Sequence, residues 1–239
     1  MAAISRAIYS MKITVLLPTR GRPQLAWRSL QSLINQATEP HNLEILLAID
    51  NDDTDTLKFF TAKRYPVKLL KFERLGYKKL HMYLNTLAKH ATGDWFMFWN
   101  DDAMMLTRQW DRQIYKHAGE FVLLRMPVKN HPHPFALFPI IPRTWYDLLG
   151  VISTTTQADR YIYEIMSRVL VKRCIVDIPV VCYHDRYDLT GNNKDTTYEQ
   201  RTYMEGDPTN PEHIDHVDTQ ARIWTSSMVI SRYLANLKD

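Results

Sequence analysis

The chain has 239 residues, of which 45% are hydrophobic and 11% aromatic, a composition typical of one large globular domain and unlike that of a disordered protein. Its formal net charge of +4 suits an anionic ligand but does not by itself indicate nucleic-acid binding. Because no apolar run approaches the roughly 20 residues that span a bilayer, we predict no transmembrane segment.

The first half of the chain alternates between strand-like and helix-like runs. Amphipathic helices are predicted at residues 23–36 and 77–91, the first with Pro23 in its opening turn and the second with Gly93 just past its end. Apolar strands are predicted at residues 12–18, 43–50, 67–72 and 95–99. This order predicts a parallel sheet with helices on both faces and a ligand at the carboxyl ends of the strands.

The second half is less regular. Strands are expected at residues 120–128, 135–141 and 174–183, and helices at residues 143–150, 157–171 and 218–237. The last helix is expected to be amphipathic, with Ala221, Trp224, Met228 and Leu234, and to pack on the core. The polar stretch 184–211 predicts a long loop or lid.

The two cysteines, Cys174 and Cys182, fall in one predicted strand and are eight residues apart. An extended strand would hold their Cα atoms more than about 20 Å apart, far beyond disulfide reach. We therefore expect free thiols, which fit a reducing compartment and a cytoplasmic protein.

Acidic residues end two of the predicted strands. Asp50 begins the acidic turn 50–55, and Asp101 and Asp102 follow the buried run WFMFW. In a parallel sheet these strand ends lie along one edge, where converging carboxylates repel unless a cation or a hydrogen-bond donor satisfies them. Such an oxygen-rich site suits Mg²⁺ or Mn²⁺ bridging to phosphates, although each turn alone is also typical of a solvated loop.

The chain resembles family 2 glycosyltransferases with the GT-A fold. Three stretches carry the resemblance: VLLPTRGRPQLAWRSLQSLINQ, LEILLAIDNDDTD and GYKKLHMYLNTLAKHATGDWFMFWNDD. The spacing from Asn85 through Gly93 to Asp102 is the most informative part, and the match is good over residues 12–102 and loose elsewhere. The resemblance implies a single α/β GT-A (Rossmann-like) domain, with a mostly parallel sheet flanked by helices and a C-terminal loop and helix.

The resemblance also implies an activity, namely transfer of a sugar from a nucleotide diphosphate sugar to an acceptor hydroxyl with Mn²⁺ or Mg²⁺. Asp102, the last residue of the DXD-like Asn100-Asp101-Asp102, would bind the metal, and Asp50 would accept a hydrogen bond from a uridine or guanosine base. The implied nucleotide-sugar-binding residues are Pro18, Thr19, Arg22, Asp50, Lys78, Asn85, Asn100 and Asp101.

An inverting transferase needs a base that deprotonates the acceptor. The family places an acid at the start of a helix after the acceptor-binding segment, which implies Asp159 as the base and Glu164 as second choice; Asp159 also suits a helix N-terminus on its own. A His beyond the last core strand is often a further metal ligand, which implies His184, although a lone His is commonly just hydrogen-bonded.

Two positions depart from the family pattern. Asn100 replaces the first acid of the DXD motif, with Asp101 as a possible substitute, and Leu84 stands where an Arg is common. Lys78 and Lys79 are expected to supply the missing positive charge unless they only form a solvated helix face.

We expect residues 1–11 to be an N-terminal extension, 12–102 the nucleotide-sugar-binding half, 103–185 the acceptor-binding and catalytic half, and 186–239 the loop or lid and C-terminal helix. Three alternatives stay open: a retaining transferase, a nucleotidyltransferase with PTRGRP as a poor phosphate loop, and an inactive scaffold that binds sugar nucleotides. The oligomeric state stays open as well.

The acceptor also stays open among a glycan, a lipid-linked glycan, a protein, a small molecule and a modified nucleic acid. His131 and His133 are candidates to reach it, and a nucleic acid would need a basic groove. Residues that would contribute to such a groove are Arg108, Arg112, Lys116, Arg125 and Lys129. His213 and His216, three residues apart, suit a polar helix start better than a metal site.

Overall fold

The computed structural model describes residues 11–63, 67–170, 173–192, 194, 199 and 209–237. Nearly all of the expected N-terminal extension, residues 1–11, lies outside the described residues, as does much of the expected loop or lid between residues 184 and 211.

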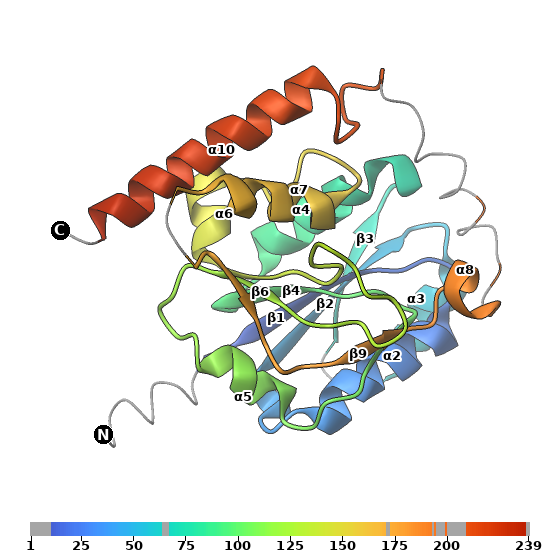
Figure 1. Ribbon diagram of the computed structural model, residues 1–239. Coiled ribbons are helices and arrows are strands. Elements are labelled where there is room, and N and C mark those ends of the chain that lie inside the picture. Colours follow the sequence, from blue (N-terminus) through green and yellow to red (C-terminus); the bar gives the residue numbers. More distant parts are fainter. Residues whose placement is uncertain are drawn as a thin grey trace.

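A seven-stranded sheet with the order β3-β2-β1-β4-β7-β6-β8 forms the centre of the protein (Figure 1). The strands are β1 (Ile13–Pro18), β2 (Leu43–Asp50), β3 (Val67–Phe72), β4 (Trp95–Phe98), β6 (Leu123–Arg125), β7 (Ile140–Pro142) and β8 (Ile175–Asp177). All neighbours are parallel except β7, which is antiparallel to both β4 and β6. The predicted mostly parallel sheet is confirmed.

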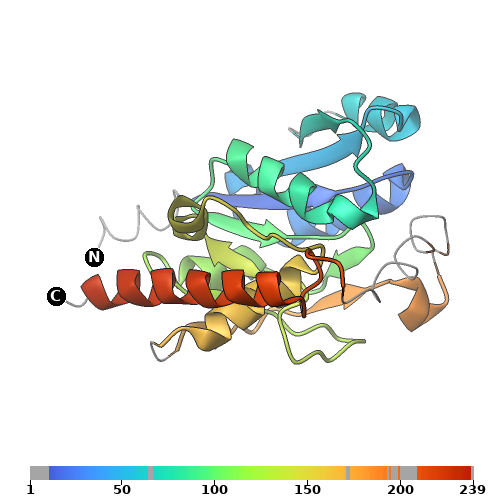
Figure 2. The same cartoon turned by 90° about the horizontal axis from the view of Figure 1, so that it is seen from above.

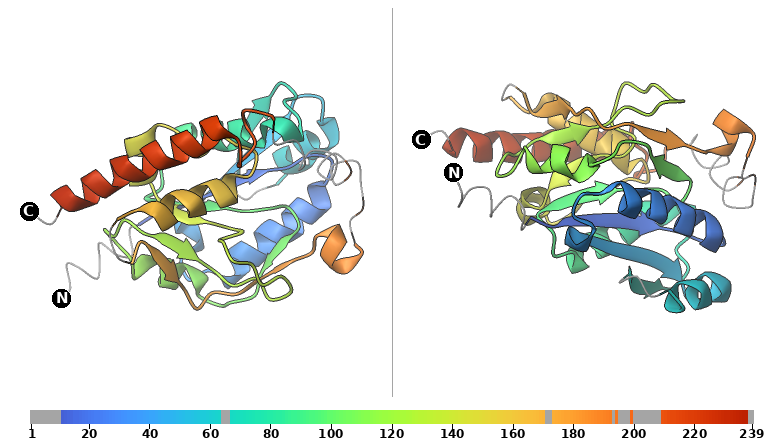
Figure 3. Two further views of the ribbon diagram at one scale, coloured as in Figure 1. Left: turned by 45° about the horizontal axis from the view of Figure 1, so that its top comes forward. Right: turned by 90° about the horizontal axis from the view of Figure 1, so that it is seen from below.

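Helices cover both faces of this sheet. The helical elements of the described residues are α2 (Pro23–Gln36), η1 (Pro40–Asn42), α3 (Thr54–Thr61), η2 (Tyr77–Lys79), α4 (Leu80–His90), α5 (Trp110–Tyr115), α6 (Thr144–Leu149), α7 (Ala158–Arg168), α8 (Tyr187–Thr190) and α10 (Val217–Asn236). Apolar residues of α2, α3 and α5 pack on one face, and those of α4, α6, α7 and α10 pack on the other. Figure 3 shows α2 and α10 on opposite sides of the sheet. Because both layers share one sheet, the chain forms the single α/β domain that was predicted.

A second, two-stranded sheet was not predicted. It pairs β5 (Ala103–Met105) with β9 (Cys182–His184) in antiparallel register, so that Ala103 lies opposite His184. The predicted strand 174–183 is therefore wrong as one element, because it divides into β8 and β9 in different sheets on either side of Pro179. Both cysteines are buried and free, as expected.

The strands predicted at residues 120–128 and 135–141 are much shorter than expected. Only Leu123–Arg125 and Ile140–Pro142 pair in the sheet. Proline lacks the backbone N–H that a sheet ladder needs, and four prolines interrupt this region. They are Pro127, Pro132, Pro134 and Pro139.

The C-terminal helix α10 packs on the core as predicted, lying along the outside of the layer that contains α6 and α7 (Figure 2). The predicted apolar face is partly wrong, because Ile223, Ile230 and Leu234 are buried whereas Trp224 is 58% exposed. The helix carries apolar residues on two faces, and the sequence pattern alone did not show which one meets the core. No helix in the described part of the chain is long and apolar enough to cross a membrane.

Gly93 lets β4 lie close beside β1. Its backbone N–H donates a 2.9 Å hydrogen bond to Oγ1 of Thr14, and a Cβ at this position would lie 2.5 Å from that oxygen and 2.8 Å from the Thr14 nitrogen. No ordinary side-chain contact is that short, so a larger residue would push the two strands apart. The strand that ends in Asp101 and Asp102 therefore takes its position partly from this glycine.

We expect Gly93→Ala to lower the free energy of unfolding by about 3 kcal/mol, because the added methyl meets backbone atoms that cannot rotate away. Urea denaturation would measure the change. Gly119→Ala is the matched control, since a Cβ there meets nothing within 4 Å and only the positive φ of 77° is strained. We expect that control to cost about 1 kcal/mol. Equal losses in the two variants would contradict the close-contact explanation.

Candidate active site at the carboxyl edge of the sheet

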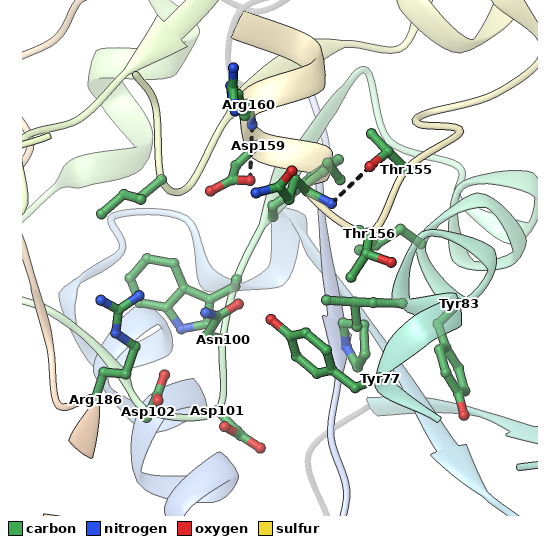
Figure 4. Close-up of a pocket in the computed structure, with 18 of the residues that line it drawn as sticks. Tyr77, Tyr83, Asn100, Asp101, Asp102, Thr155, Thr156, Asp159, Arg160 and Arg186 are labelled. Carbon is green, nitrogen blue, oxygen red and sulfur yellow. Dashed lines mark hydrogen bonds between the residues drawn. The ribbon is translucent and has the colours of Figure 1, made fainter. Parts of the chain in front are cut away.

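A cavity of about 620 Å³ opens where β1, β2 and β4 end (Figure 4). One wall consists of residues at or just after these strand ends and residues of η2 and α4. The opposite wall consists of the loop around residues 131–137 and the start of α7, while His184, at the end of β9, lies beside Asp102. We predicted a ligand at the carboxyl ends of the strands. The described residues form this cavity at that edge of the sheet.

At one end of the cavity, Asp50 is almost completely buried and both of its carboxylate oxygens are hydrogen-bonded. The Tyr83 hydroxyl donates to Oδ1 at 2.5 Å, and Nη1 of Arg20 donates to Oδ2 at 2.9 Å. Burial, with the hydrogen bond to Asp50, raises the pKa of Tyr83 to about 12, so this tyrosine remains a donor at neutral pH. Asp50 is thus held in one orientation.

Sequence reasoning missed both partners of Asp50. Arg20 follows the first strand directly, and its guanidinium also contacts both carboxylate oxygens of Asp52 at 2.5 and 2.8 Å. Its place in the turn PTRGRP was a signal, because that turn lies at the sheet edge between two acidic turns. Tyr83 lies in the middle of α4, where nothing in the sequence distinguishes it from an ordinary core residue.

Asp101 is buried against the turn that follows β1. It accepts hydrogen bonds from Oγ1 of Thr19 at 2.8 Å and from Nη1 of Arg22 at 3.1 Å. Burial raises the pKa of Asp101 to about 6, while the charge of Arg22 acts in the opposite direction. The acid that was expected to substitute for Asn100 is therefore already bonded to the protein.

Asp102 faces His184. Its Oδ1 lies 3.0 Å from Nε2 of the imidazole, and the backbone N–H of Asp185 donates to the Asp102 carbonyl at 2.8 Å. Although burial alone would raise the pKa of Asp102, the hydrogen bond and charge of His184 lower it. Asn130 fixes the other side of His184 by exchanging two hydrogen bonds with its backbone, at 2.8 and 3.0 Å.

The donor set of Asp102 and His184 fits a divalent cation bound together with a phosphate. Among the described residues, no group of three or more His, Cys, Asp or Glu side chains could hold a metal ion without other ligands. Mg²⁺ and Mn²⁺ commonly take only one or two protein ligands and complete their shells with phosphate oxygens and water. The carboxylate of Asp102 and the imidazole of His184, which lie 3.0 Å apart, are of the types that would serve as these ligands.

Asp159 lies at the opposite wall from Asn100, Asp101 and Asp102, in the first turn of α7 (Figure 4). Its Oδ1 accepts a 2.9 Å hydrogen bond from the backbone N–H of Arg160. Glu164, the second candidate base, does not line the cavity and instead contacts Arg160 at 2.7 Å and Arg168 at 3.1 Å. Asp159 is thus the better placed of the two acids.

Most of the other predicted site residues also line the cavity. They are Pro18, Thr19, Arg22, Lys78, Asn100, His131, His133 and His213. Lys79 instead forms an ion pair with Glu212, and His216 caps α10 by accepting a hydrogen bond from the N–H of Asp218. Asn85 does not line the cavity, because its amide is hydrogen-bonded to Ile152 and Ser153. Asn85 was predicted to contact the nucleotide, but its position outside the cavity does not indicate such a contact.

Residues 14–130 match the sequence model of Glycosyl transferase family 2. The structure is similar to that of the mannosyltransferase PcManGT from Pyrobaculum calidifontis in complex with GDP-Man and Mn²⁺, with 16% identity, a TM-score of 0.58, and coverage of 94% of this chain and 75% of that one. The chain is a family 2-like glycosyltransferase with the GT-A fold.

This glycosyltransferase is also similar to residues 1–349 of TarS from S. aureus, with 16% identity, a TM-score of 0.56, and coverage of 82% of this chain and 70% of that one. The same TarS fragment in complex with UDP gives 15% identity, a TM-score of 0.54, and coverage of 84% and 74%. At these identities the likeness to the solved structures shows the fold alone. No curated protein matches the glycosyltransferase by sequence.

We expect Arg22→Met to lower the free energy of unfolding by about 3 kcal/mol, because it leaves the buried Asp101 without its cationic partner. Chemical denaturation would measure the change. The double variant Arg22→Met with Asp101→Asn should recover most of the loss, since the charge that needs a partner is then removed as well. Simple additivity of the two single changes would show that the ion pair does not couple these residues.

Proposed function

We propose that this glycosyltransferase moves a sugar from a uridine or guanosine diphosphate sugar to an acceptor hydroxyl, with a divalent cation and with inversion at the anomeric carbon. One observation carries the proposal: a single cavity contains the hydrogen-bonded carboxylate of Asp50, the Asp102–His184 pair and the carboxylate of Asp159. The GDP-Man, UDP and Mn²⁺ bound to the two structural neighbours also support it.

The choice of base follows from the groups at the Asp50 end of the cavity. Asp50 is an acceptor and the neighbouring Arg20 is a donor, held 2.9 Å apart. Uracil and guanine each present a ring N–H next to a carbonyl oxygen, which complements such an acceptor–donor pair. Adenine and cytosine present an acceptor nitrogen where Asp50 is itself an acceptor, so two lone pairs would face each other with no hydrogen between them.

Asp102 and His184 would hold the Mn²⁺ or Mg²⁺ in this proposal. When bound, the cation supplies positive charge to the diphosphate that leaves as the sugar is transferred. The arginines of the turn after β1 are already bonded to protein carboxylates, since Arg20 contacts Asp50 and Arg22 contacts Asp101. The ammonium of Lys78, an exposed residue in the wall of the cavity, would add further positive charge near the phosphates.

Asp159 would take the proton of the acceptor hydroxyl as that oxygen attacks the anomeric carbon. The N–H of Arg160 fixes its carboxylate at the cavity wall, and the guanidinium of Arg160 is directed to Glu164 and Asp215. A base on the far side of the sugar from the leaving group favours direct displacement, and hence inversion, over the retaining alternative. The family match favours a glycosyltransferase over a nucleotidyltransferase or an inactive scaffold.

The two walls of the cavity support the proposed division into a donor half, residues 12–102, and an acceptor half, residues 103–185, followed by the loop and C-terminal helix of residues 186–239. The basic residues proposed for a nucleic-acid groove do not line the cavity, and Arg125 among them is paired with Asp177. A nucleic-acid acceptor is therefore not supported by these residues. The two free cysteines fit the reducing cytoplasm that we propose as the location.

We expect the purified protein with Mn²⁺ to hydrolyse one uridine or guanosine diphosphate sugar slowly, and to leave adenosine diphosphate sugars intact. A panel of donors, with release of nucleoside diphosphate followed in each, would measure this. A chelator should abolish the release, and Asp102→Ala should lower it by roughly 100-fold because the charge that the cation supplies is lost.

The matched control for Asp102→Ala is Asp177→Asn, which removes a carboxylate outside the cavity and should leave the rate unchanged. Hydrolysis that persists in the presence of chelator and in Asp102→Ala would refute the role of the metal. If no nucleotide raised the melting temperature of the protein, with or without Mn²⁺, the proposal of a nucleotide-sugar donor would fail.

We expect Asp159→Asn to lower donor turnover by about 100-fold or more while the affinity for nucleoside diphosphate stays the same, because only the proton acceptor is lost. Glu164→Gln, on the same helix but outside the cavity, should retain near-normal turnover. NMR of the first sugar released should show the anomer opposite to that of the donor. Release of the same anomer would identify a retaining enzyme and rule out Asp159 as an inverting base.

A further inference from the structure

We infer that Asn85 positions Asp159, by holding in place the segment that leads into α7. The inference rests on the base proposed above. It assigns Asn85 a role in the acceptor half of the site, although the residue itself belongs to the donor half and does not line the cavity.

Asn85 makes three hydrogen bonds to one short piece of backbone. Its Oδ1 accepts from the N–H of Ile152 at 2.8 Å and from the N–H of Ser153 at 3.1 Å, and its Nδ2 donates to the Ser153 carbonyl at 2.8 Å. Ile152 and Ser153 are completely buried, so these backbone groups have no access to bulk water. The side-chain amide therefore provides partners that a buried backbone needs.

From Ser153 the hydrogen bonds continue along the chain to α7. Ser153 Oγ donates to the Thr155 carbonyl at 2.8 Å and accepts from the Thr155 N–H at 3.1 Å. Oγ1 of Thr155 then accepts from the N–H of Gln157, the residue at the N-cap position of α7, at 3.3 Å. Figure 4 shows Thr155 near the start of this helix and Asp159 in its first turn.

The donor side of the cavity contacts the same segment a second time. Oγ1 of Thr156 donates to the Lys78 carbonyl, in η2, at 2.7 Å. Tyr83, two residues before Asn85 on α4, hydrogen-bonds Asp50. Positions two apart on a helix point in widely different directions, so α4 contacts the nucleobase end of the site with one side chain and the acceptor half with another.

Only a side chain with both a donor and an acceptor satisfies this segment. Asn85→Leu would leave two N–H groups and one carbonyl without partners, and Asn85→Asp would keep an acceptor for the N–H groups but oppose the Ser153 carbonyl with an oxygen. A shift of the segment would move Asp159, and a displacement of about 1 Å at a catalytic group can cost about 100-fold in rate.

The test compares Asn85→Leu and Asn85→Asp with Thr86→Ala, a control on the next residue of α4 whose hydroxyl donates to the Met82 carbonyl of the same helix. Three kinds of measurement would be made on the 239-residue chain with Mn²⁺. They are hydrogen exchange of the amides in residues 151–157, affinity for UDP and GDP, and kcat and KM for hydrolysis of the donor found in the panel.

In Asn85→Leu we expect faster exchange at Ile152 and Ser153, a kcat lower by about tenfold or more, and a nucleotide affinity and KM within about twofold of the original protein. Asn85→Asp should lie between Asn85→Leu and the original protein, and Thr86→Ala should match the latter. Weaker nucleotide binding with unchanged exchange would overturn the inference and make Asn85 a donor-binding residue. Faster exchange with unchanged kcat would overturn it too.

The two proposals fail in different ways. If the original protein hydrolysed no donor, the proposed function would fail, and the inference that Asn85 positions a catalytic base would be overturned with it. If the original protein hydrolysed a donor and Asn85→Leu hydrolysed it equally fast, the proposed function would stand and only the inference about Asn85 would be refuted.

Discussion

Carboxylates buried at one edge of a sheet must each find a donor, and in this protein one short turn supplies most of them. The four residues after β1, Thr19 to Arg22, lie between the ends of β2 and β4. Thr19 and Arg22 donate to Asp101, Arg20 donates to Asp50 and Asp52, and the N–H of Gly21 donates to Asp53 at 2.7 Å. The turn thereby holds two acidic strand ends together that would otherwise repel each other.

This arrangement changes the meaning of the sequence PTRGRP. Its two arginines and its glycine suggested a poor version of a phosphate-binding loop, but its donors are directed at side-chain carboxylates of the protein. Arg20 and Arg22 already pair with Asp50 and Asp101, so their positive charges do not balance the negative charges of a diphosphate. A nucleoside diphosphate bound in the cavity would thus need positive charge from elsewhere, which is the physical reason to pair this site with a divalent cation and with Lys78.

The sequence predicted those parts of the structure that local pattern decides. Strands β1, β2 and β3 and the helix α2 begin and end within a residue of their predicted limits, because apolar runs, Pro23 and the acidic turns mark them. The second sheet was missed, since β5 and β9 pair across nearly eighty residues and each is only three residues long. In the same way, Arg20 and Tyr83 become site residues only when the fold brings them to Asp50.

Asn85 is a second case in which the sequence pattern did not predict a long-range contact. Its spacing from Gly93 and Asp102 was the most informative pattern in the chain, yet the hydrogen bonds that it makes reach residues 152 and 153, in a segment that the pattern does not include. A sequence motif gives the residue type at a position but does not say which distant residue that side chain hydrogen-bonds. The partner appears only when α4 packs beside the segment that precedes α7.

The balance of charge at this edge of the sheet also explains why a neutral residue, Asn100, is tolerated beside Asp101 and Asp102. It is the exposed member of the Asn100-Asp101-Asp102 run, and its amide nitrogen lies 3.5 Å from Nε2 of His184. A carboxylate there would add a third negative charge beside Asp101 and Asp102, and the cationic Arg22 already contacts both of these acids. A neutral amide avoids that repulsion and keeps a polar group at the cavity wall. The departure from an acidic first position is therefore compatible with the proposed site, in which Asp102 and His184 would hold the cation.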